Sequence, residues 1–342
     1  MTLEVNELSR RYGTKQAVTD VSFALEDGEI VGLLGPSGCG KTTIVQMVAG
    51  HTAPDAGSVV LRGTDVTEEP PERRDVGVVF QQSTLYPHMT VRENVRYGLD
   101  AVDIEPEKRT RRVEEFLELV ELEGEGDSYP GALSGGQKRR VELARVLAPE
   151  PDMLLLDEPL SALDRSLRTQ LREEIVRIQR ETGVTTLFVT HDQEDAMSVA
   201  DRLVILNDGR VAAVGEPREL YESPPNRFVA SFLGRSNTLP ASDLDAMPPD
   251  DGSDRRVERQ RSEASIAHVR PADLVFCRGA DIEADLSLSG TVRAISDIGS
   301  RYDVEVELDV GETVVVEERG DPPTVGEAVT VGVDGSDVVV WE

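Results

Sequence analysis

The segment Glu29–Gly50, which reads EIVGLLGPSGCGKTTIVQMVAG, contains the pattern that decides the fold. Residues 30–34 form a short apolar run that is typical of a strand buried in a parallel sheet. Residues 42–49 predict a helix that ends at Gly50. Between the two lies Gly35-x-x-x-x-Gly40-Lys41-Thr42, the P-loop pattern. The segment therefore predicts a strand, a glycine-rich loop and a helix, the core of an α/β P-loop nucleotide-binding fold.

The chemistry of this loop is phosphate binding. Its glycines let consecutive backbone N–H groups point inward, and the positive end of the helix dipole faces the same concavity. Lys41 can reach the outer phosphates as a point charge, and the Thr42 hydroxyl is placed to bind a magnesium ion that bridges them. The alternative is a glycine-rich turn that merely precedes a helix. Strand, loop, lysine and threonine all agree with the phosphate site.

The charge of the chain is strongly negative, with 36 Lys plus Arg against 65 Asp plus Glu and a formal net charge of −29. This argues against direct nucleic-acid binding. Because such a surface repels itself unless salt screens it, we hypothesise a host with a salty cytoplasm; the alternative is an ordinary acidic protein. Stability that is greatest in dilute buffer would contradict the salt hypothesis.

The sequence predicts a cytosolic chain without a disulfide. No stretch approaches the roughly 18–20 apolar residues that cross a bilayer, and no signal peptide follows Met1. Cys39 and Cys277 are far apart and lie in different predicted domains, so we expect no bond between them.

The residues around the P-loop predict a mixed α/β domain. Leu3–Leu25 alternates in polarity around Gly13 and predicts an antiparallel hairpin, with Tyr12 at a turn from which an aromatic ring can stack on a purine. A strand over residues 76–80 runs into Gln81, an amide at a strand end where α/β proteins contact ligands. Residues 91–145 predict a helical insertion. A lone tyrosine near a turn is, by itself, more often structural.

Three further stretches carry polar groups suited to a nucleotide. Ser134-Gly135-Gly136-Gln137 opens a helix and makes a second anion-binding cap, although a Gly-Gly turn alone is often plain. A buried strand over 153–156 ends in Asp157 and Glu158, whose side chains point to different sides, so that one can face magnesium and the other a water. His191 follows the strand over 185–189 and can contact a terminal phosphate; a lone histidine is commonly structural.

Together these motifs resemble those of ABC transporter ATPase subunits, over about the first 235 residues. The stretches that carry the resemblance, in order, are Tyr12, the P-loop (Gly35, Pro36, Ser37, Gly38, Cys39, Gly40, Lys41, Thr42, Thr43), Gln81, the signature Leu133–Gln137, the Walker B residues Asp157 and Glu158, the D-loop Ser161–Asp164 and the H-loop His191. The signature distinguishes this family from P-loop kinases and GTPases.

The resemblance implies roles that the spacing alone does not give. Family members work as head-to-tail dimers, so Ser134, Gly135, Gly136 and Gln137 would close over ATP held by a second subunit, with a homodimer expected. Glu158 would polarise the attacking water, His191 would contact the γ-phosphate, and Asp164 would lie near the nucleotide. Thr42, Gln81 and Asp157 would bind Mg²⁺, with Gln81 also reporting nucleotide state to a permease.

A finer match is to importer subunits for sugars, polyamines, ferric iron, sulfate, molybdate and phosphonates. It rests on residues 85–91, LYPHMTV, and 190–194, THDQE. The resemblance implies a peripheral protein on the cytoplasmic face of the membrane, bound to permease subunits and served indirectly by a solute-binding protein. Lys138 and Glu142 stand where this group more often has Arg and Ala, and we expect both on the surface of the signature helix. Residues 232–237, FLGRSN, lack a run common in sugar importers, which favours an ion, oxyanion or polyamine.

The residues from 236 onward predict a second, all-β domain. Residues 237–260 are rich in Asp, Pro and Ser and predict a linker. Short Val- and Ile-rich segments between 265 and 341 predict a small barrel. Residues 269–274, VRPADL, and 289–292, SGTV, resemble the OB-like regulatory TOBE domain of these importers. Single-stranded nucleic-acid binding is the alternative, but it uses basic grooves with stacking aromatics, whereas this segment is strongly acidic and offers only Phe276, Tyr302 and Trp341.

Two other functions remain to be compared with transport. A soluble ABC ATPase of translation or repair usually has two cassettes or a long coiled coil, and the sequence has neither. A regulatory protein that binds ATP without hydrolysis would not need Glu158 and His191. Co-purification with a hydrophobic permease distinguishes the first function from both.

Overall fold

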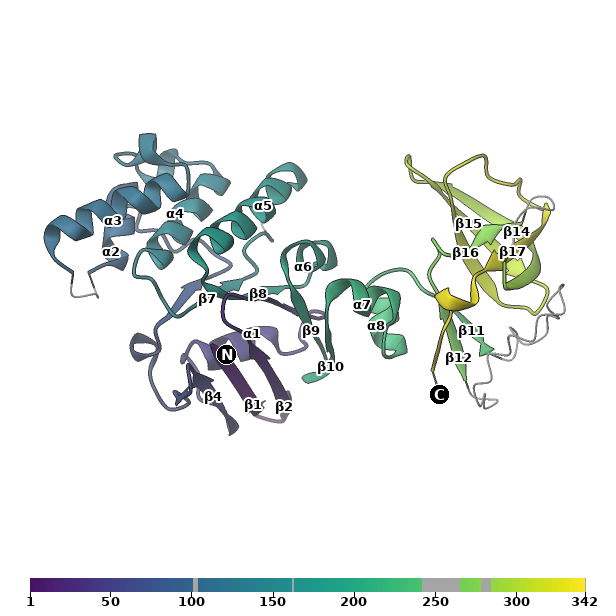
Figure 1. Cartoon of the computed structure of the whole chain (residues 1–342), viewed down its shortest axis with the longest axis horizontal. Coiled ribbons are helices and arrows are strands. Elements are labelled where there is room, and N and C mark those ends of the chain that lie inside the picture. The colour runs from purple at the N-terminus through teal and green to yellow at the C-terminus, as the bar shows by residue number, and fades with distance from the viewer. Residues whose placement is uncertain (101–103, 162, 242–264, 278–283, 342) are drawn as a thin grey trace. The chain divides into compact units, whose positions relative to one another are not determined.

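The computed structural model describes residues 1–100, 104–161, 163–241, 265–277 and 284–341, and its chain divides into two compact units, 1–217 and 218–342 (Figure 1). Most of the predicted linker (242–260) and Ala162 of the D-loop lie outside the described residues. Among those described, no helix is both long enough and apolar enough to cross a membrane.

The first unit is built on a six-stranded sheet in the order β10-β9-β3-β8-β7-β6. Its strands are β3 (Ile30–Leu34), β6 (Val76–Val79), β7 (Met153–Asp157), β8 (Thr185–Thr190), β9 (Arg202–Asn207) and β10 (Arg210–Gly215). Five strands are parallel, and β10 adds an antiparallel edge to β9. All five residues of β3 are buried, as expected for a strand covered on both faces. The sheet confirms the predicted mixed α/β core.

A smaller antiparallel sheet covers one side of this core. It consists of β1 (Leu3–Tyr12), β2 (Lys15–Leu25), β4 (Ala56–Leu61) and β5 (Thr64–Asp65), in the order β2-β1-β4-β5. The P-loop helix α1 (Lys41–Val48) lies between the two sheets (Figure 1). Its buried Ile44, Met47 and Val48 join one apolar cluster with side chains from both sheets. This packing fixes the direction of the helix that begins at the phosphate loop.

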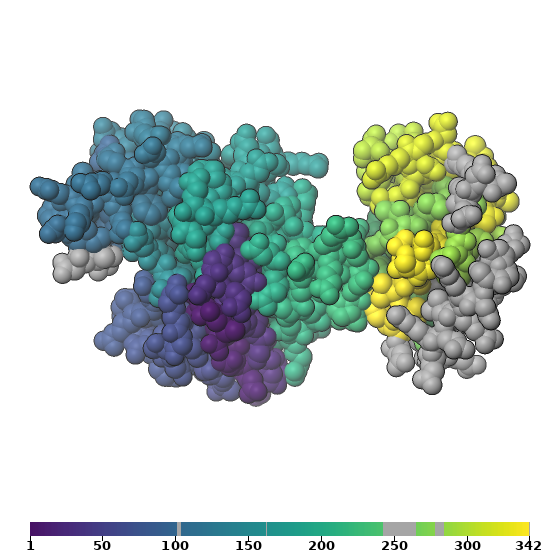
Figure 2. Space-filling model, in the orientation of Figure 1, coloured from purple at the N-terminus to yellow at the C-terminus, as the bar shows by residue number. Residues whose placement is uncertain are grey.

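Helices cover the other face of the large sheet. They are α2 (Val91–Gly98), α3 (Pro106–Leu119), α4 (Gly135–Leu147), α5 (Arg165–Thr182) and α6 (Gln193–Val199). A second cluster joins Val95, Leu117 and Leu143 of these helices to Leu154 and Phe188 of the sheet. In the space-filling view, the helical part and the antiparallel sheet occupy different sides of the first unit (Figure 2).

The elements described in the second unit are mainly strands, together with the short helices α7 (Pro217–Glu222) and α8 (Arg227–Phe232) and a short 3-10 turn over residues 335–337. Its three-stranded sheet contains β11 (Asn237–Pro240), β12 (Ile266–Val269) and β18 (Val339–Trp341). Its five-stranded sheet contains β13 (Val275–Phe276), β14 (Leu286–Asp297), β15 (Tyr302–Leu308), β16 (Thr313–Glu318) and β17 (Ala328–Val333). One apolar cluster draws on both sheets.

Two details of the second unit differ from the sequence-based expectation. The sequence places the boundary after residue 235, whereas α8 and nearly all of α7 belong to the second unit. Buried Arg270 explains this, because its guanidinium donates to the carbonyls of Tyr221 and Ala230. The start of the predicted linker is also a strand, β11, because the Asn237 amide exchanges two 2.8 Å hydrogen bonds with the backbone of Val315.

Candidate functional site

The phosphate loop has the geometry that its glycines predict. Gly40, which directly precedes α1, has φ +107°, and a Cβ there would lie 2.6 Å from the Ala17 carbonyl oxygen. A Cβ on Gly35 would lie 2.5 Å from the Leu206 carbonyl oxygen. No side chain caps the first turn of α1 at Gly40. Its N–H groups are therefore available to an anion, as the sequence predicts.

Lys41 is folded back into this loop. Its side chain is buried, and Nζ donates to the carbonyl oxygens of Gly35 (2.6 Å) and Pro36 (3.0 Å). These neutral acceptors are weaker partners for an ammonium than phosphate oxygens. A bound nucleotide can therefore draw Lys41 away from them without unfolding the loop.

The carboxyl ends of three neighbouring strands bring Gln81, Glu158 and His191 together. Because β6, β7 and β8 are adjacent and parallel, the residues that follow them meet at one sheet edge. Glu158 Oε1 lies 2.9 Å from His191 Nδ1, and Glu158 Oε2 accepts a 3.0 Å hydrogen bond from Gln81 Nε2. Gln81 Nε2 also lies 3.4 Å from Ser161 Oγ. The three side chains that the sequence assigns to catalysis thus form one connected group.

Glu158 has an unusual backbone that the sequence does not reveal. Its φ is +46°, a left-handed value that costs energy for a residue with a Cβ. Its N–H donates to the Val189 carbonyl oxygen at 2.9 Å, which ties the turn to the neighbouring strand. This strained turn re-aims the carboxylate toward Gln81 and His191 rather than along the strand.

Asp157 lies beside this group in a different environment. Burial and then neighbouring Glu158 raise the pKa of the Asp157 carboxyl, and the charges of Lys41 and Arg139 oppose this rise. A carboxylate held in these conditions suits a cation. Among the described residues no three His, Cys, Asp or Glu side chains gather into a metal cluster. One carboxylate, the Thr42 hydroxyl and the Gln81 amide would instead fit Mg²⁺, which keeps waters and phosphate oxygens as its other ligands.

The signature residues lie at the start of α4 in a capping box. Ser134 Oγ accepts from the Gln137 N–H (3.2 Å), and the Ser134 N–H donates to Gln137 Oε1 (2.9 Å). The Ser134 hydroxyl proton is still free to donate, and Ser134 and Gly135 are exposed. Within the described part of the chain, no hydrogen bond or ion pair joins residues 134–137 to the loop 35–43.

Two other predicted nucleotide contacts also lie apart from the catalytic group. Tyr12 is 45% exposed, and the Arg10 guanidinium lies 5.2 Å from its ring centroid. Asp164 caps α5, with its carboxylate accepting from the Leu167 N–H at 3.0 Å. Neither residue contacts Gln81, Glu158 or His191 among the described interactions.

The sequence-based expectation for Glu142 is wrong. This residue is buried at 2% exposure rather than lying on the surface of α4. Its carboxylate pairs with Arg139 and accepts from the Thr84 N–H, so it contacts the loop that carries Gln81. The charged residues Arg139, Glu142 and Arg145 recur every three residues along α4. This spacing is the sequence signal that could have indicated a shared polar contact on one side of the helix. Only the folded loop reveals what they bind.

Comparison with known proteins agrees with this geometry. A family model described as ABC transporter matches residues 18–161, and one described as TOBE domain matches residues 267–341. The chain is 40% identical over 341 residues to a Fe(3+) ions import ATP-binding protein of Rhizobium etli, covering 97% of this chain and 95% of that one. It is 42% identical over 343 residues to a spermidine/putrescine import ATP-binding protein of Acidothermus cellulolyticus, covering 97% and 88%.

A solved structure extends the comparison to an assembly. It is a dimeric ATP-binding cassette in a post-hydrolysis state, bound to ADP and Pi. It is 30% identical to this chain, with a TM-score of 0.55, and the match covers 63% of this chain and 99% of that one.

Proposed function

This chain belongs to the ATP-binding proteins of ABC importers, a family of ATPases, and we propose that two copies of it close around ATP to drive a solute through a separate membrane permease. The observation that carries the proposal is the convergence of Gln81, Glu158 and His191 at one sheet edge, next to the phosphate loop of the same sheet.

In the proposed mechanism Glu158 is the base that polarises the attacking water. Both of its carboxylate oxygens are engaged, one with His191 and one with Gln81. A γ-phosphate that attracts His191, and a water or Mg²⁺ that attracts Gln81, would free these oxygens to accept a proton. The base is thus held occupied until the nucleotide arrives, which limits futile hydrolysis.

The residues expected to hold Mg²⁺ are Thr42, Gln81 and Asp157. The ion would supply positive charge to the terminal phosphates. Lys41 would leave the Gly35 and Pro36 carbonyls and bind the same phosphates. The N–H groups of the loop and of the first turn of α1 would orient them for in-line attack.

The second half of the site is proposed to come from a second copy of the chain. Ser134 and Gly135 are exposed, and no interaction among the described residues joins them to the phosphate loop of their own chain. Closing them over a partner's ATP would add N–H and hydroxyl donors to the γ-phosphate. A charge-stabilising group supplied in trans can raise the rate by roughly 10³–10⁵.

The test is the variant Glu158→Gln, which keeps the side-chain shape but removes the base. We expect it to bind Mg-ATP, to form a dimer on size exclusion, and to hydrolyse ATP at least about a thousandfold more slowly than the wild type. The matched control is Glu158→Gln combined with Ser134→Arg, which should bind ATP but stay monomeric. Full turnover by Glu158→Gln would remove Glu158 from the base role, and a monomer in ATP would contradict the shared site.

The transported solute is proposed to be an ion, an oxyanion or a polyamine. Support comes from the missing sugar-importer run in residues 232–237 and from the names of the two relatives, one for ferric ions and one for spermidine/putrescine. The alternative is a sugar. The ligand of a solute-binding protein encoded beside this chain decides between them. Co-purification with a permease from membranes tests the proposed place on the cytoplasmic face and separates transport from a soluble ABC function.

A further inference from the structure

Helix α4 is tied along one side to the loop that carries Gln81. The buried guanidinium of Arg139 donates to the carbonyl oxygens of Phe80 (2.7 Å), Gln81 (3.3 Å) and Pro159 (3.0 Å). One side chain of the signature helix therefore holds the ends of β6 and β7, the two strands that present Gln81 and Glu158.

Glu142, one turn further along α4, completes this contact. Its Oε2 accepts from Arg139 at 2.8 Å, and its Oε1 accepts from the Thr84 N–H at 2.8 Å. Arg145, on the next turn, donates to the Thr84 carbonyl oxygen at 2.8 Å. A buried carboxylate that loses its partners is costly, so the Arg139–Glu142 pair and the loop hold one another in a single arrangement.

We propose that Arg139 and Glu142 are positioning residues for ATP hydrolysis, because they fix Gln81 against the signature helix. When the signature of one chain closes over the ATP held by the partner, this contact would set Gln81 of the same chain beside the ATP that this chain itself holds. This inference rests on the proposed function, because it needs the signature to serve the partner's nucleotide. It adds the residues that link the movement of the signature helix to the position of Gln81 within one chain.

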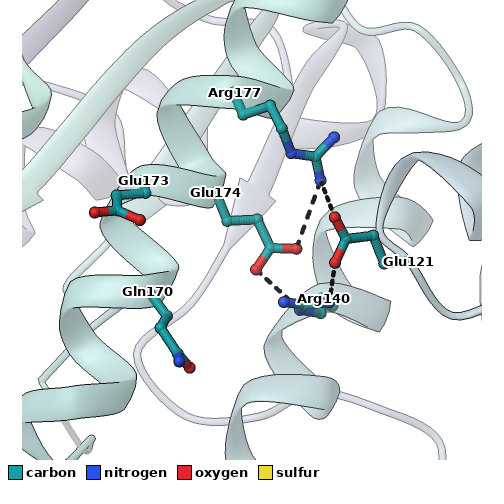
Figure 3. Close-up of a pocket in the computed structure, with 6 residues that line it drawn as sticks. All are labelled: Glu121, Arg140, Gln170, Glu173, Glu174 and Arg177. Atoms are coloured by element: carbon teal, nitrogen blue, oxygen red, sulfur yellow. Dashed lines mark hydrogen bonds and ion pairs between the residues drawn. The ribbon is translucent and has the colours of Figure 1, made fainter.

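The other side of α4 provides a matched control. There Arg140 pairs with Glu121 (3.1 Å) and with buried Glu174 of α5 (2.9 Å), beside a cavity of about 220 Å³ that Arg177 also lines (Figure 3). The Glu174 side chain is 6% exposed, close to the 3% of Glu142, although Arg140 is more exposed than Arg139. The Arg140–Glu174 pair links α4 to α5 and does not touch residues 80–84 among the described contacts. Removing it disturbs the same helix without releasing the Gln81 loop.

The experiment compares Glu142→Ala, Glu142→Gln and Glu174→Gln in the purified full chain with Mg-ATP. We expect Glu142→Ala to lower kcat about tenfold while KM for ATP changes less than about threefold, since a misplaced Gln81 affects the transition state more than binding. Hydrogen exchange at the Thr84 amide should become faster. Glu142→Gln restores an acceptor for that amide and should recover part of kcat, whereas Glu174→Gln should leave kcat and Thr84 exchange as in the wild type.

Any one of three results would overturn this inference and leave the proposed function standing. They are a wild-type kcat in Glu142→Ala, an equal loss of kcat in Glu174→Gln, and faster Thr84 exchange without any loss of kcat. If Glu142→Ala does not fold, Arg139→Lys decides: its ammonium cannot reach the carbonyls of Phe80, Gln81 and Pro159 together as the guanidinium does, so an unchanged kcat in that variant contradicts the role. A wild-type chain without ATPase activity would instead overturn the proposed function, and the inference with it.

Discussion

In the first unit, buried Lys41 and Arg139 bind backbone carbonyls of loops that carry the proposed chemistry. In the second unit, buried Arg270 and His268 bind groups that hold the unit together. Arg270 donates to the carbonyl oxygens of Tyr221, Ala230 and Arg235, and its guanidinium lies 4.1 Å from the Tyr221 ring centroid. Both units contain buried basic side chains, but the groups to which these side chains bind differ in their role.

The difference shows how to distinguish a polar side chain that can bind a ligand from one that stabilises the fold. Lys41 has two neutral oxygen acceptors that a phosphate can replace, and they lie in a loop whose Ser37 and Gly38 are exposed. Arg270 is 2% exposed and donates four hydrogen bonds to fixed backbone carbonyl oxygens, those of Tyr221, Ala230 and Arg235. A buried charge that is satisfied only by replaceable partners points to ligand binding, and one that is satisfied by fixed partners points to positioning or to architecture.

The largest expected effect is on activity, from Lys41→Ala in the first unit. We expect hydrolysis to fall by at least about a thousandfold, because a cation at the transferring phosphate is lost. The free energy of unfolding should fall by only about 1–3 kcal/mol, since two hydrogen bonds to the Gly35 and Pro36 carbonyls are removed. ATP turnover and urea unfolding check this. A large loss of stability would place Lys41 with Arg270 instead.

The converse is expected for Arg270→Ala in the second unit. The change leaves three carbonyls without their donor and removes a cation–π contact, which should lower the free energy of unfolding by about 3–5 kcal/mol. The chain has a single tryptophan, Trp341, which lies in the second unit, so urea unfolding followed by its fluorescence reports on this region. Basal ATPase activity should stay near wild type. A matched loss of kcat would mean that the second unit takes part in the chemistry.

The sequence predicted the parts of the site that depend on local pattern. The strand, loop and helix around Lys41 follow from hydrophobic periodicity and from glycines with positive φ. The strands that end at Gln81, Glu158 and His191 were also predicted, because each is a short apolar run before a polar residue. What local pattern cannot give is the order of strands in the sheet, and only the adjacency of β6, β7 and β8 turns three strand ends into one site.

The residues that the sequence misplaced share one physical cause. Glu142 was expected on a surface because an acidic residue on a helix is usually solvated, but Arg139 and the Thr84 N–H compensate its burial. Asn237 was expected in a linker, yet its amide replaces a peptide group for Val315. In both cases a long-range polar contact overrides the local preference. Sequence spacing contains no record of such a partner.

A third prediction concerns His268 and the acid stability of the second unit. His268 is buried, its Nδ1 bonds Ser236 Oγ at 2.5 Å, and its ring stacks on Trp341. Burial, with some repulsion from Arg270, lowers the pKa of His268 from 6.5 to about 4. The folded state therefore keeps the ring neutral while the unfolded state gains a proton, so stability is present above pH 6.5 and is lost as the pH falls toward 4.

The loss from this single group should reach up to about 3.5 kcal/mol across that window. Urea unfolding at a series of pH values, followed by Trp341 fluorescence, measures it. His268→Gln should be less stable near neutral pH but should have a flatter profile between pH 6.5 and 4. An unchanged slope in the variant would assign the acid sensitivity to other groups.

The smallest effect is expected from Asp195 in the first unit, and it has the opposite sign. Asp195 is buried in α6, facing Arg168 and Arg172 of α5 and neighbouring Asp192 and Glu194. Burial and then Asp192 raise the pKa of Asp195 from 3.8 to about 6, and the two arginines oppose this. Between these values the folded carboxyl holds a proton that the unfolded one has lost. Its contribution to stability is therefore present below pH 3.8 and is lost as the pH rises to 6.

This loss should be at most about 3 kcal/mol, and Asp195→Asn should remove it, because the amide does not titrate. Urea unfolding at several pH values, followed by helical circular dichroism, measures the free energy of unfolding. This free energy should fall less steeply with rising pH in the variant than in the wild type. If the wild type instead gained stability from pH 4 to 6 in this signal and Asp195→Asn did not, Arg168 and Arg172 would be holding an ionised carboxylate. The ionised Asp195 would then be held by fixed partners, as Arg270 is in the second unit.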